Sequence, residues 1–363
     1  MYIWEHKNWP QFKWDEHKIN ELLVQVRYQQ GKLMGMADTL GFDVKSPVIL
    51  DAMTSDIIKS SEIEGIALNA DDVRSSIAWQ LGIDRIGVPS SDRYVEGVVE
   101  VMFDAVHHCD EPLSEERLFG WHRLLFPSPH RLSRITVGKW RYGDAPMQVV
   151  SGHFGREKVH YEAPASKVVP LMMKELLRWI NEAETDSVLK AAIAHLWFVS
   201  IHPFSDGNGR LARTITDMLL AKADKSSYRF YSMSAQIAFA RKEYYDILER
   251  TQKGTLDITE WIVWFLGRLD RAINMAMETI GRTLHKATFW ESNRHVSMNE
   301  RQTMMINMLW DGFEGKLTSS KWAKINKCSP DTALRDIQDL VSKGILVRAE
   351  GGGRSTSYHL AGD

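Results

Sequence analysis

IHPFSDGNGRLAR, residues 201–213, places a histidine, a carboxylate, two glycines, an asparagine and two arginines within one short run. It follows the apolar run LKAAIAHLWFVSI and leads into a second helical run, RLARTITDMLLAKA. The first run belongs to a segment that is apolar nearly all round, which predicts a buried central helix over 187–201. The junction therefore predicts a helix–loop–helix in which a polar loop is held by a buried scaffold.

The glycines of this loop favour an anion-binding site. Gly207 and Gly209 allow backbone conformations that turn successive N–H groups, including that of Asn208, toward one point, and the next helix adds its positive N-terminal end. Arg210 and Arg213 are three positions apart, so they share a face near that end. Two guanidiniums beside such a nest indicate a polyphosphate, because each can make charge-assisted bonds to phosphoryl oxygens.

The other residues of the loop supply a metal ligand, a base and an anchor. Asp206 is a hard oxygen ligand, suited to Mg²⁺ that bridges phosphates. His202 is the natural general base, since the ordinary pKa of histidine is about 6.5. Phe204 alternates with these polar groups and is expected to anchor the loop inward. The chain contains no GxxxxGK[ST] sequence, so this is not a Walker loop.

HPFSDGNGRLAR resembles, position for position, the signature HxFx[D/E]GNGRxxR of Fic-domain proteins. These enzymes typically transfer AMP from ATP to a serine, threonine or tyrosine hydroxyl of a target protein. The resemblance implies that His202 deprotonates the target hydroxyl and that Asp206 binds Mg²⁺. It assigns the phosphates as follows: the α- and β-phosphates to Gly207, Asn208 and Gly209, the β-phosphate to Arg210, and the γ-phosphate to Arg213.

The resemblance extends to the reaction type and to the surroundings of the loop. Family members that phosphorylate carry lysine at the position of Gly209, so glycine favours nucleotidyl transfer. Short β-favouring runs flank a glycine-containing turn over 147–164, which predicts a hairpin. It occupies the place of the family's flap, which pins the target segment by strand-like pairing. Tyr244 and Tyr245 fall where related proteins place aromatics near the adenine, although their pattern also fits core packing.

A second motif lies upstream, at the end of a predicted helix. Ser46 followed by Pro47 predicts the start of this helix, and Gly65 predicts its end. Glu64 lies at the negative end of the helix dipole, where a carboxylate is mildly unfavourable. Ser60 and Glu64 are four residues apart and share a face. The pattern resembles the family's inhibitory motif [S/T]xxxE[G/N], which implies that Glu64 pairs with Arg213 and blocks the γ-phosphate.

Composition limits the remaining functions. The chain has 363 residues, 44% of them apolar and 25% charged, with a net charge of −2, so nothing global points to nucleic acid or membranes. Its two cysteines, Cys109 and Cys328, lie far apart, which argues against a disulfide scaffold and fits a reducing cytosol. The N-terminus lacks a signal layout, and no apolar run is long enough for a membrane span. We expect a soluble cytoplasmic protein.

The tail from residue 298 predicts a different unit. Three helices followed by two short strand candidates around a glycine-rich stretch are typical of a winged helix-turn-helix. Residues 298–363 hold nine lysines and arginines against eight aspartates and glutamates, a net of +1, and three aspartates fall on the candidate recognition helix. That charge is poor for tight DNA binding. DNA binding therefore stays open without being favoured over dimerisation or docking of a target.

The expected fold is mainly α. We expect a Fic-type helical core with a β-hairpin flap, an N-terminal helical domain and a C-terminal winged helix-turn-helix. The expected boundaries are 1–110 for the N-terminal domain with the inhibitory helix, 111–270 for the core, 271–297 for a linker helix and 298–363 for the winged helix.

The expected function is a protein adenylyltransferase. It would move AMP from MgATP to protein hydroxyls, its own included, and be autoinhibited by Glu64. Three alternatives remain at this point: a transcriptional regulator whose core only senses nucleotide, a site that removes AMP, and a transferase that uses another phosphate-containing donor. The intact His202 argues against the sensor, because a sensor needs no base.

Overall fold

The structure is a computed structural model that describes residues 1–83, 92–127, 135–152, 158–349 and 356–361, with the side chains of 42 and 43 left out. The chain is mainly helical, as expected, and divides into two compact units, residues 1–280 and 281–363. The boundary falls inside one helix, α11 (Thr259–Ser292). The four-part division expected from the sequence stays a prediction.

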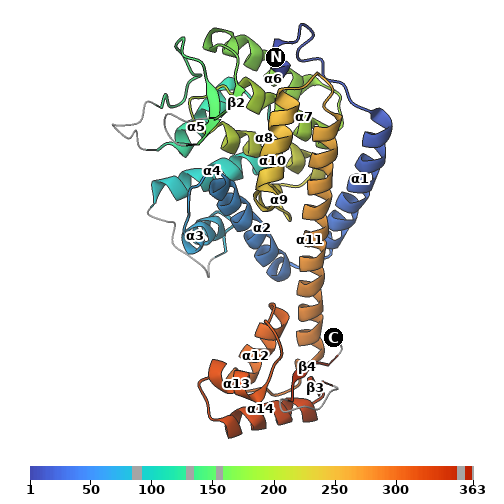
Figure 1. The fold of residues 1–363 in the computed structure, drawn as a ribbon. Coiled ribbons are helices and arrows are strands. Elements are labelled where there is room, and N and C mark those ends of the chain that lie inside the picture. The colour runs from blue at the N-terminus through green and yellow to red at the C-terminus, as the bar shows by residue number, and fades with distance from the viewer. Residues whose placement is uncertain (84–91, 128–134, 153–157, 350–355, 362–363) are drawn as a thin grey trace. The chain divides into compact units, whose positions relative to one another are not determined.

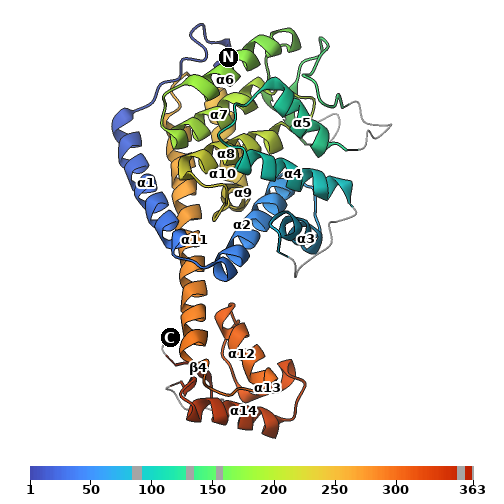
Figure 2. The same cartoon turned by 180° about the vertical axis from the view of Figure 1, so that it is seen from behind.

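Where the structure describes it, the larger unit consists of helices and one two-stranded sheet (Figure 1). Its α-helices besides α11 are α1 (Glu16–Asp38), α2 (Phe42–Ile63), α3 (Ala70–Gln80), α4 (Arg93–His107), α5 (Glu115–Leu125), α6 (Val169–Glu182), α7 (Ser187–Ile201), α8 (Asn208–Asp224), α9 (Met233–Phe239) and α10 (Arg241–Gln252). Short 3₁₀ turns lie at Ile3–Glu5 and Ser166–Val168. Seen from both sides, α7 and α8 lie in the middle of this unit (Figures 1 and 2).

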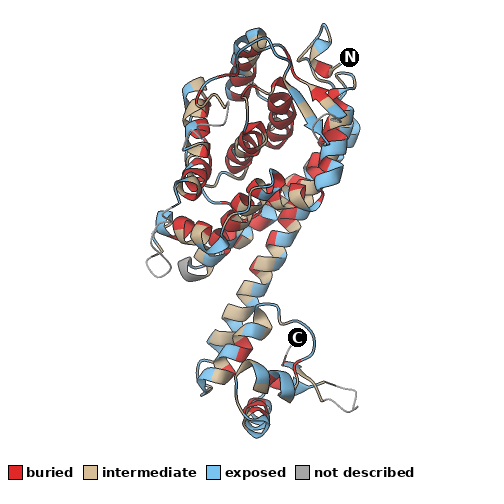
Figure 3. Ribbon diagram, turned by 60° about the vertical axis from the view of Figure 1, so that its left-hand side comes forward, coloured by how far each residue is buried: buried red, intermediate tan, exposed pale blue. Residues whose placement is uncertain are grey.

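The central helix α7 has the bounds that the apolar pattern predicts. Asp186 caps its start by accepting the backbone N–H groups of Val188 and Leu189 at 2.8 and 3.3 Å. Every residue from 191 to 201 is buried, and buried helices fill the centre of the unit (Figure 3). Helix α7 is therefore the buried core element that carries the polar loop.

Among the helices of the described residues, none combines the length and apolar composition needed to cross a bilayer.

Helix α2 corrects the start predicted at Ser46 and Pro47. The helix begins at Phe42, and Pro47 lies inside it. Gly41 is the N-cap in an extended conformation, and its carbonyl accepts from the N–H groups of Val44 and Lys45 at 3.0 and 2.9 Å. These bonds start the helix five residues before Pro47. Because proline has no backbone N–H, the helix lacks one backbone hydrogen bond near its first turn. The end follows the sequence pattern: Gly65 has a φ of 77°, which ends the helix.

The hairpin expected over 147–164 consists of β1 (Gln148–Ser151) and β2 (Lys158–Glu162). The strands pair antiparallel, and the turn between them lies outside the described residues. Ala163 N–H also donates to the Met147 carbonyl at 2.9 Å, which extends the pairing beyond the strands. Tyr161 is buried and fixes the hairpin to α7, because its hydroxyl donates to the Ser200 carbonyl at 2.6 Å.

The smaller unit has the order of elements expected for the tail. After the end of α11 it contains α12 (Glu300–Trp310), α13 (Ser319–Ile325), α14 (Pro330–Ser342) and the antiparallel strands β3 (Leu346–Arg348) and β4 (Tyr358–Leu360). Its own core includes Trp322, Ile337 and Leu360. Asp336 on α14 is buried and pairs with Arg301 at 2.8 Å. This carboxylate is used inside the unit, so it does not add negative charge to an exposed face of α14.

Candidate active site

A cavity of about 730 Å³ opens beside the loop that joins α7 to α8. Its lining comes from the end of α2, from both strands of the hairpin, from this loop and from α10. The structure thus brings together segments that are far apart in the sequence. The predicted site residues that line it are Glu64, His202, Asp206, Gly207, Asn208, Gly209, Arg213, Tyr244 and Tyr245.

Four predicted site residues lie beside this lining. Phe204 is fully buried beneath the loop, where its ring stacks on His122 with centroids 4.3 Å apart. It anchors the loop as expected and does not line the cavity. Arg210 turns away from the cavity, toward Tyr94 and Phe126. The last two, Ser60 and Gly65, belong to the end of α2, and Ser60 reaches the site through Arg213.

His202 has the geometry of a base that is neutral at physiological pH. Its backbone has a φ of 52°, in the left-handed region, where α7 ends. The ring nitrogen Nδ1 lies 3.3 Å from the Val199 carbonyl, so Nδ1 carries the proton and Nε2 is the basic nitrogen. Burial, together with the charge of Arg141, lowers the pKa of His202 to about 4, despite the bond to Val199.

The loop is closed by the side chain of Asn208. Its Oδ1 accepts the Phe204 N–H at 2.9 Å, and its Nδ2 donates to the Phe204 carbonyl at 2.8 Å. Gly207 has a φ of 80° and is the N-cap of α8, a conformation that favours glycine. The N-terminal end of α8 therefore meets the cavity with its positive dipole end. This geometry suits an anion, as the glycines led us to expect, and Asn208 holds the shape of the loop. The binding of an anion here stays a prediction.

Arg213 is buried and is held by the end of α2. Its Nη2 donates to Glu64 Oε1 at 2.8 Å and to the Ser60 carbonyl at 2.9 Å, and its Nε donates to Ser60 Oγ at 2.9 Å. The side chain of Arg213 is only 2% exposed, whereas that of Glu64 is 32% exposed toward the cavity. The pairing expected from the sequence pattern is therefore present as a contact.

Glu64 lies against the backbone of the predicted anion site. A Cβ atom added at Gly209 would collide with Glu64 Oε1, so the carboxylate touches the first turn of α8. Burial alone would raise the pKa of Glu64, but the charges of Arg213, Arg210 and Arg241 outweigh it and lower the pKa below its ordinary value. Glu64 is consequently an anion at neutral pH, bound where the helix end favours negative charge.

Asp206 fits a site for Mg²⁺ that is completed by a phosphate ligand. Its carboxylate is exposed on the cavity side of the loop, and Oδ1 accepts the Gly207 N–H at 2.6 Å. Within the described part of the chain, no group of three or more histidine, cysteine, aspartate or glutamate side chains could hold a metal ion. Mg²⁺ usually binds through one or two carboxylates together with substrate phosphates. A single aspartate beside an anion site satisfies that requirement.

The two predicted tyrosines differ in position. Tyr244 is 2% exposed, and its hydroxyl lies 2.8 Å from Nε2 of His195, whose Nδ1 lies 2.9 Å from Thr216. His195 is thus a core histidine with both nitrogens bonded. Tyr245 is 41% exposed, and the Arg241 guanidinium lies 5.8 Å from its ring centroid. Tyr245 offers the cavity an accessible aromatic surface, and Tyr244 supports it from beneath.

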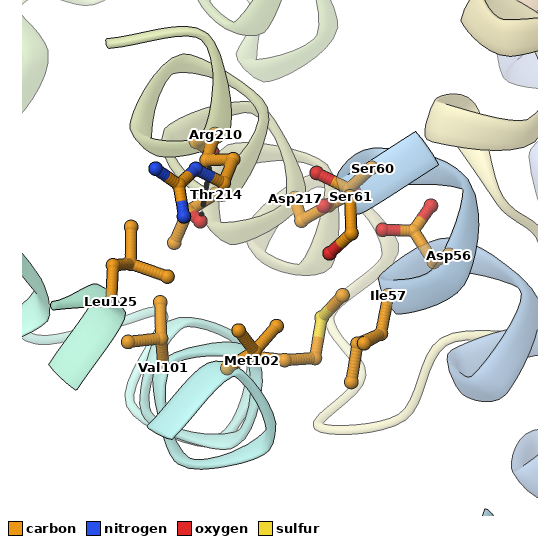
Figure 4. A pocket seen from close by; sticks show the side chains of 11 residues that line it. Asp56, Ile57, Ser60, Ser61, Val101, Met102, Leu125, Arg210, Thr214 and Asp217 are labelled. Carbon is orange, nitrogen blue, oxygen red and sulfur yellow. Dashed lines mark hydrogen bonds between the residues drawn. The ribbon is translucent and has the colours of Figure 1, made fainter. Parts of the chain in front are cut away.

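The end of α2 is fixed to the core by a polar contact. Asp56 accepts bonds from Ser232 Oγ at 2.5 Å and from the Ser234 N–H at 3.1 Å, at the start of α9. Beside it, a small cavity of about 30 Å³ lies between α2, α4, α5 and α8 (Figure 4). Burial and the neighbouring Asp56 raise the pKa of Asp217, which lines this cavity. The segment that carries Ser60 and Glu64 is therefore tied to α9 through Asp56 and to α8 through Arg213.

Two residues that support the loop carry no signal in the sequence. Arg141 is buried; its Nε donates to the His202 carbonyl at 2.7 Å, and its Nη2 donates to the Ile201 and Pro164 carbonyls. His122 lies 3.2 Å from the Asp206 carbonyl through Nε2, and its Nδ1 accepts the Gly138 N–H at 3.0 Å. Both act through backbone atoms, and neither belongs to a periodic pattern around the motif.

Residues 112–220 match the Fic/DOC family. This Fic/DOC segment includes α5, the hairpin, α6, α7 and most of α8, and so contains the whole polar loop. Residues 2–83 match a second family, described as a domain of unknown function (DUF4172), which contains α1 and α2. His202 and the N-terminal end of α8 lie in one match, and Glu64 lies in the other.

Three curated relatives are similar over parts of the chain. A probable protein adenylyltransferase of Aquifex aeolicus is 30% identical over 101 residues, 28% of this chain and 29% of that protein. The protein adenylyltransferase Fic of Drosophila grimshawi is 30% identical over 147 residues, and that of Drosophila ananassae is 32% identical over 129 residues. These matches cover 36% and 31% of this chain, and 30% and 26% of those proteins. The chain spans less than a third of the length of these relatives.

Two solved structures have a similar fold. A Fic family protein from Desulfovibrio desulfuricans has a TM-score of 0.54 at 20% identity and covers 95% of this chain and 96% of its own. A Fic domain containing signaling protein from Bacteroides thetaiotaomicron has a TM-score of 0.51 at 18% identity and covers 72% and 96%. These likenesses concern the fold. They agree with the Fic/DOC segment found from the sequence.

Proposed function

We propose that this chain is a protein adenylyltransferase that moves AMP from MgATP to hydroxyls of protein side chains and is held inactive by Glu64. The observation that carries the proposal is the pairing of Glu64 with Arg213 beside a neutral histidine and an anion-binding helix end. The names of the curated relatives support nucleotidyl transfer. The glycine at 209 supports it as well.

The chemistry assigned to the loop is general base catalysis with electrostatic stabilisation. His202 Nε2 accepts the proton of the target hydroxyl as its oxygen attacks the α-phosphorus of ATP. The N-terminal end of α8 and its first N–H groups stabilise the charge on the phosphates and on the departing pyrophosphate. Asp206 would hold Mg²⁺, which neutralises phosphate charge when bound. The exposed face of Tyr245 provides a surface for stacking the adenine.

The inhibition follows from competition for Arg213. Its Nη2 and Nε are donors to Glu64 and Ser60, so a γ-phosphate must displace these partners before Arg213 can bind it. Charge-assisted hydrogen bonds contribute about 1.5–3 kcal/mol each. Removal of the carboxylate should therefore raise productive ATP use by about 10- to 100-fold. The flap would hold the target, since β1 exposes Val150 at the edge of the cavity.

The test compares Glu64→Gly with the wild type. Each protein is incubated with MgATP labelled at the α-phosphorus, alone and with a cell extract, and protein-bound label and released pyrophosphate are measured. We expect Glu64→Gly to form adenylylated protein at least tenfold faster. Labelled protein identified as an adenylyl adduct by mass spectrometry, with one pyrophosphate per adduct, would establish nucleotidyl transfer.

Glu62→Gly is the matched control. Glu62 lies two residues earlier at the same helix end, and its carboxylate pairs with Lys59 at 2.6 Å instead of Arg213. This variant introduces the same glycine and should keep the wild-type rate. Equal stimulation by Glu62→Gly would assign the effect to a loosened helix and contradict competition for Arg213. A lack of adenylyl adducts in every reaction would reject the adenylyltransferase.

A further inference from the structure

Ser151, His160 and Glu249 form a hydrogen-bonded chain at the cavity, apart from the loop that carries His202. Ser151 Oγ lies 2.6 Å from His160 Nε2, and His160 Nδ1 lies 2.6 Å from Glu249 Oε2. The three residues come from β1, β2 and α10. All three line the cavity that also holds His202 and the anion site.

An irregularity in the hairpin sets this arrangement. Val149 pairs with Tyr161 and Val150 pairs with Val159, so His160 is an extra residue in β2. Such a bulge leaves one residue outside the regular ladder and re-aims its side chain. The His160 ring is 27% exposed and reaches α10 instead of following the alternation of the strand. The geometry of the flap therefore directs this histidine to a carboxylate.

Glu249 determines which nitrogen of the His160 ring carries the proton. Its Oε1 pairs with Lys253 at 2.7 Å, and the hydrogen bonds from Lys253 and His160 lower the pKa of Glu249 to about 2. An ionised carboxylate at Nδ1 holds the ring proton there and leaves Nε2 to accept the Ser151 proton. A hydroxyl bonded to a base that is oriented by a third group is an activated nucleophile.

The other hydroxyls around the cavity lack this combination. Tyr161 is buried and donates to a backbone carbonyl, and Tyr244 is buried against His195. Burial raises the pKa of Tyr245. Ser205 Oγ accepts a backbone N–H at 3.1 Å. Among the described residues of the lining, Ser151 alone is an exposed hydroxyl bonded to a histidine that a carboxylate orients.

We propose that Ser151 is an adenylylation site of this chain, activated by His160 and Glu249. The proposal rests on the proposed function, because ATP at the anion site supplies the electrophile. Ser151 Oγ forms a bond to the α-phosphorus, and the bond from that phosphorus to the oxygen bridging to the β-phosphate breaks. Pyrophosphate leaves with the bond electrons. The serine proton passes to His160 Nε2 and then to solvent.

The test uses the full chain with Glu64→Gly, MgATP labelled at the α-phosphorus, and peptide mapping of the product. We expect the adenylyl group on the peptide that contains Ser151, and its loss when Ser151→Ala is added. Adding His160→Ala should slow the modification of Ser151 by about 100-fold or more, the usual contribution of a general base. His160→Gln, which can still bond Glu249 but is no base, should slow it equally.

Ser227→Ala is the matched control, since Ser227 is exposed and lies outside the cavity lining. It should label at the rate of Glu64→Gly alone. Adducts on other residues with Ser151 unmodified, or an unchanged rate at Ser151 after His160→Gln, would overturn this inference and leave the proposed function intact. A lack of label on the chain and on every protein of an added extract would overturn both.

Discussion

Glu64 Oε1 lies 2.8 Å from Arg213 Nη2, although 149 positions separate the two residues in the chain. Ser60 completes the contact with its hydroxyl and its carbonyl, so one turn of α2 occupies two nitrogens of a buried guanidinium. Asp56 ties the preceding turn of α2 to the start of α9. A ligand that needs Arg213 must therefore move the end of α2 or its side chains.

The Ser60 hydroxyl should help to keep Arg213 from binding ATP. Ser60→Ala removes the bond from Arg213 Nε but keeps the Glu64 pair and the carbonyl bond. Since a bond to a charged group contributes about 1.5–3 kcal/mol when buried, and this one is only part-buried, we expect activation of about 3- to 10-fold. The increase should be smaller than that of Glu64→Gly, measured as the initial rate of label transfer.

Ser55→Ala on the same helix is the control for this prediction, because Ser55 lies outside the contact with Arg213. It should transfer label at the wild-type rate. Stimulation by Ser60→Ala that equals the effect of Glu64→Gly would mean that the hydroxyl restrains Arg213 as strongly as the carboxylate does, contrary to this prediction.

The pH dependence of transfer should report the environment of His202. Burial lowers the pKa of His202 to about 4, so the ring stays neutral as the pH falls to about 5 and is protonated below about 4. We therefore expect kcat/KM of Glu64→Gly for ATP to stay level from about pH 8 to pH 5 and to fall only at lower pH. The negative charge of Glu64 raises the pKa of His202, so its removal should move this fall further toward acid.

Rates of pyrophosphate release over that pH range would measure the profile with a saturating protein acceptor. An acid limb with an apparent pKa of about 6.5 would mean that the base has the pKa of an exposed histidine. Burial would then not lower the pKa of His202 in solution. His202→Ala should remove the limb together with transfer to acceptors other than Ser151.

Asn208 should be required for the shape of the anion site. Asn208→Ala leaves the N–H and the carbonyl of Phe204 without their side-chain partners in a buried loop. We expect a loss of about 2–4 kcal/mol in the free energy of unfolding, from two unpaired polar groups, and weaker ATP binding. Urea unfolding and equilibrium binding of ATP to Glu64→Gly with and without Asn208→Ala would measure the two effects.

Asn181 offers a matched control for this change. Its side chain makes the same pair of bonds to the backbone of Leu113, at 2.9 and 3.0 Å, and neither residue lines the cavity. Asn181→Ala should lower stability without changing the affinity for ATP. Equal losses of affinity in both variants would show that the effect of Asn208→Ala is a loss of folded protein.

The sequence predicted elements that follow from local patterns, and missed those that depend on contacts across the fold. The bounds of α7 follow from a run that is apolar nearly all round. Helix α8 begins at Asn208, two residues before the helical run that the sequence indicated. Spacing placed Arg210 and Arg213 on one face, but Arg210 turns to Tyr94 at 2.9 Å and stacks over Phe126. Spacing predicts which face of the helix a side chain lies on. The direction that Arg210 takes is set by Tyr94 of α4 and by Phe126, just after α5.

The same reason explains the residues that were not predicted. Arg141 belongs to an irregular segment, so no period marks it, and its role depends on carbonyls that α7 presents. His160 and Glu249 are 89 positions apart and meet through a bulge that the alternation of β2 does not indicate. The start of α2 was misplaced because a serine followed by proline is a frequent start of a helix, whereas Gly41, which caps the helix without a side-chain bond, is a weaker signal.

Because Glu64 packs closely on α8, substitutions at Gly209 and Glu64 should be coupled in their effect on the free energy of unfolding. A Cβ atom at Gly209 would collide with Glu64 Oε1 and lie 3.2 Å from Arg213 Nη1, so Gly209→Ala must displace the pair. In the Glu64→Gly background the collision is gone, and alanine should stabilise the helix by about 0.5–1 kcal/mol relative to glycine. In the wild-type background this gain should vanish or reverse. Urea unfolding of the four proteins should give a coupling of about 1 kcal/mol or more, whereas additive effects within about 0.5 kcal/mol would mean that Glu64 does not rest on Gly209 in solution.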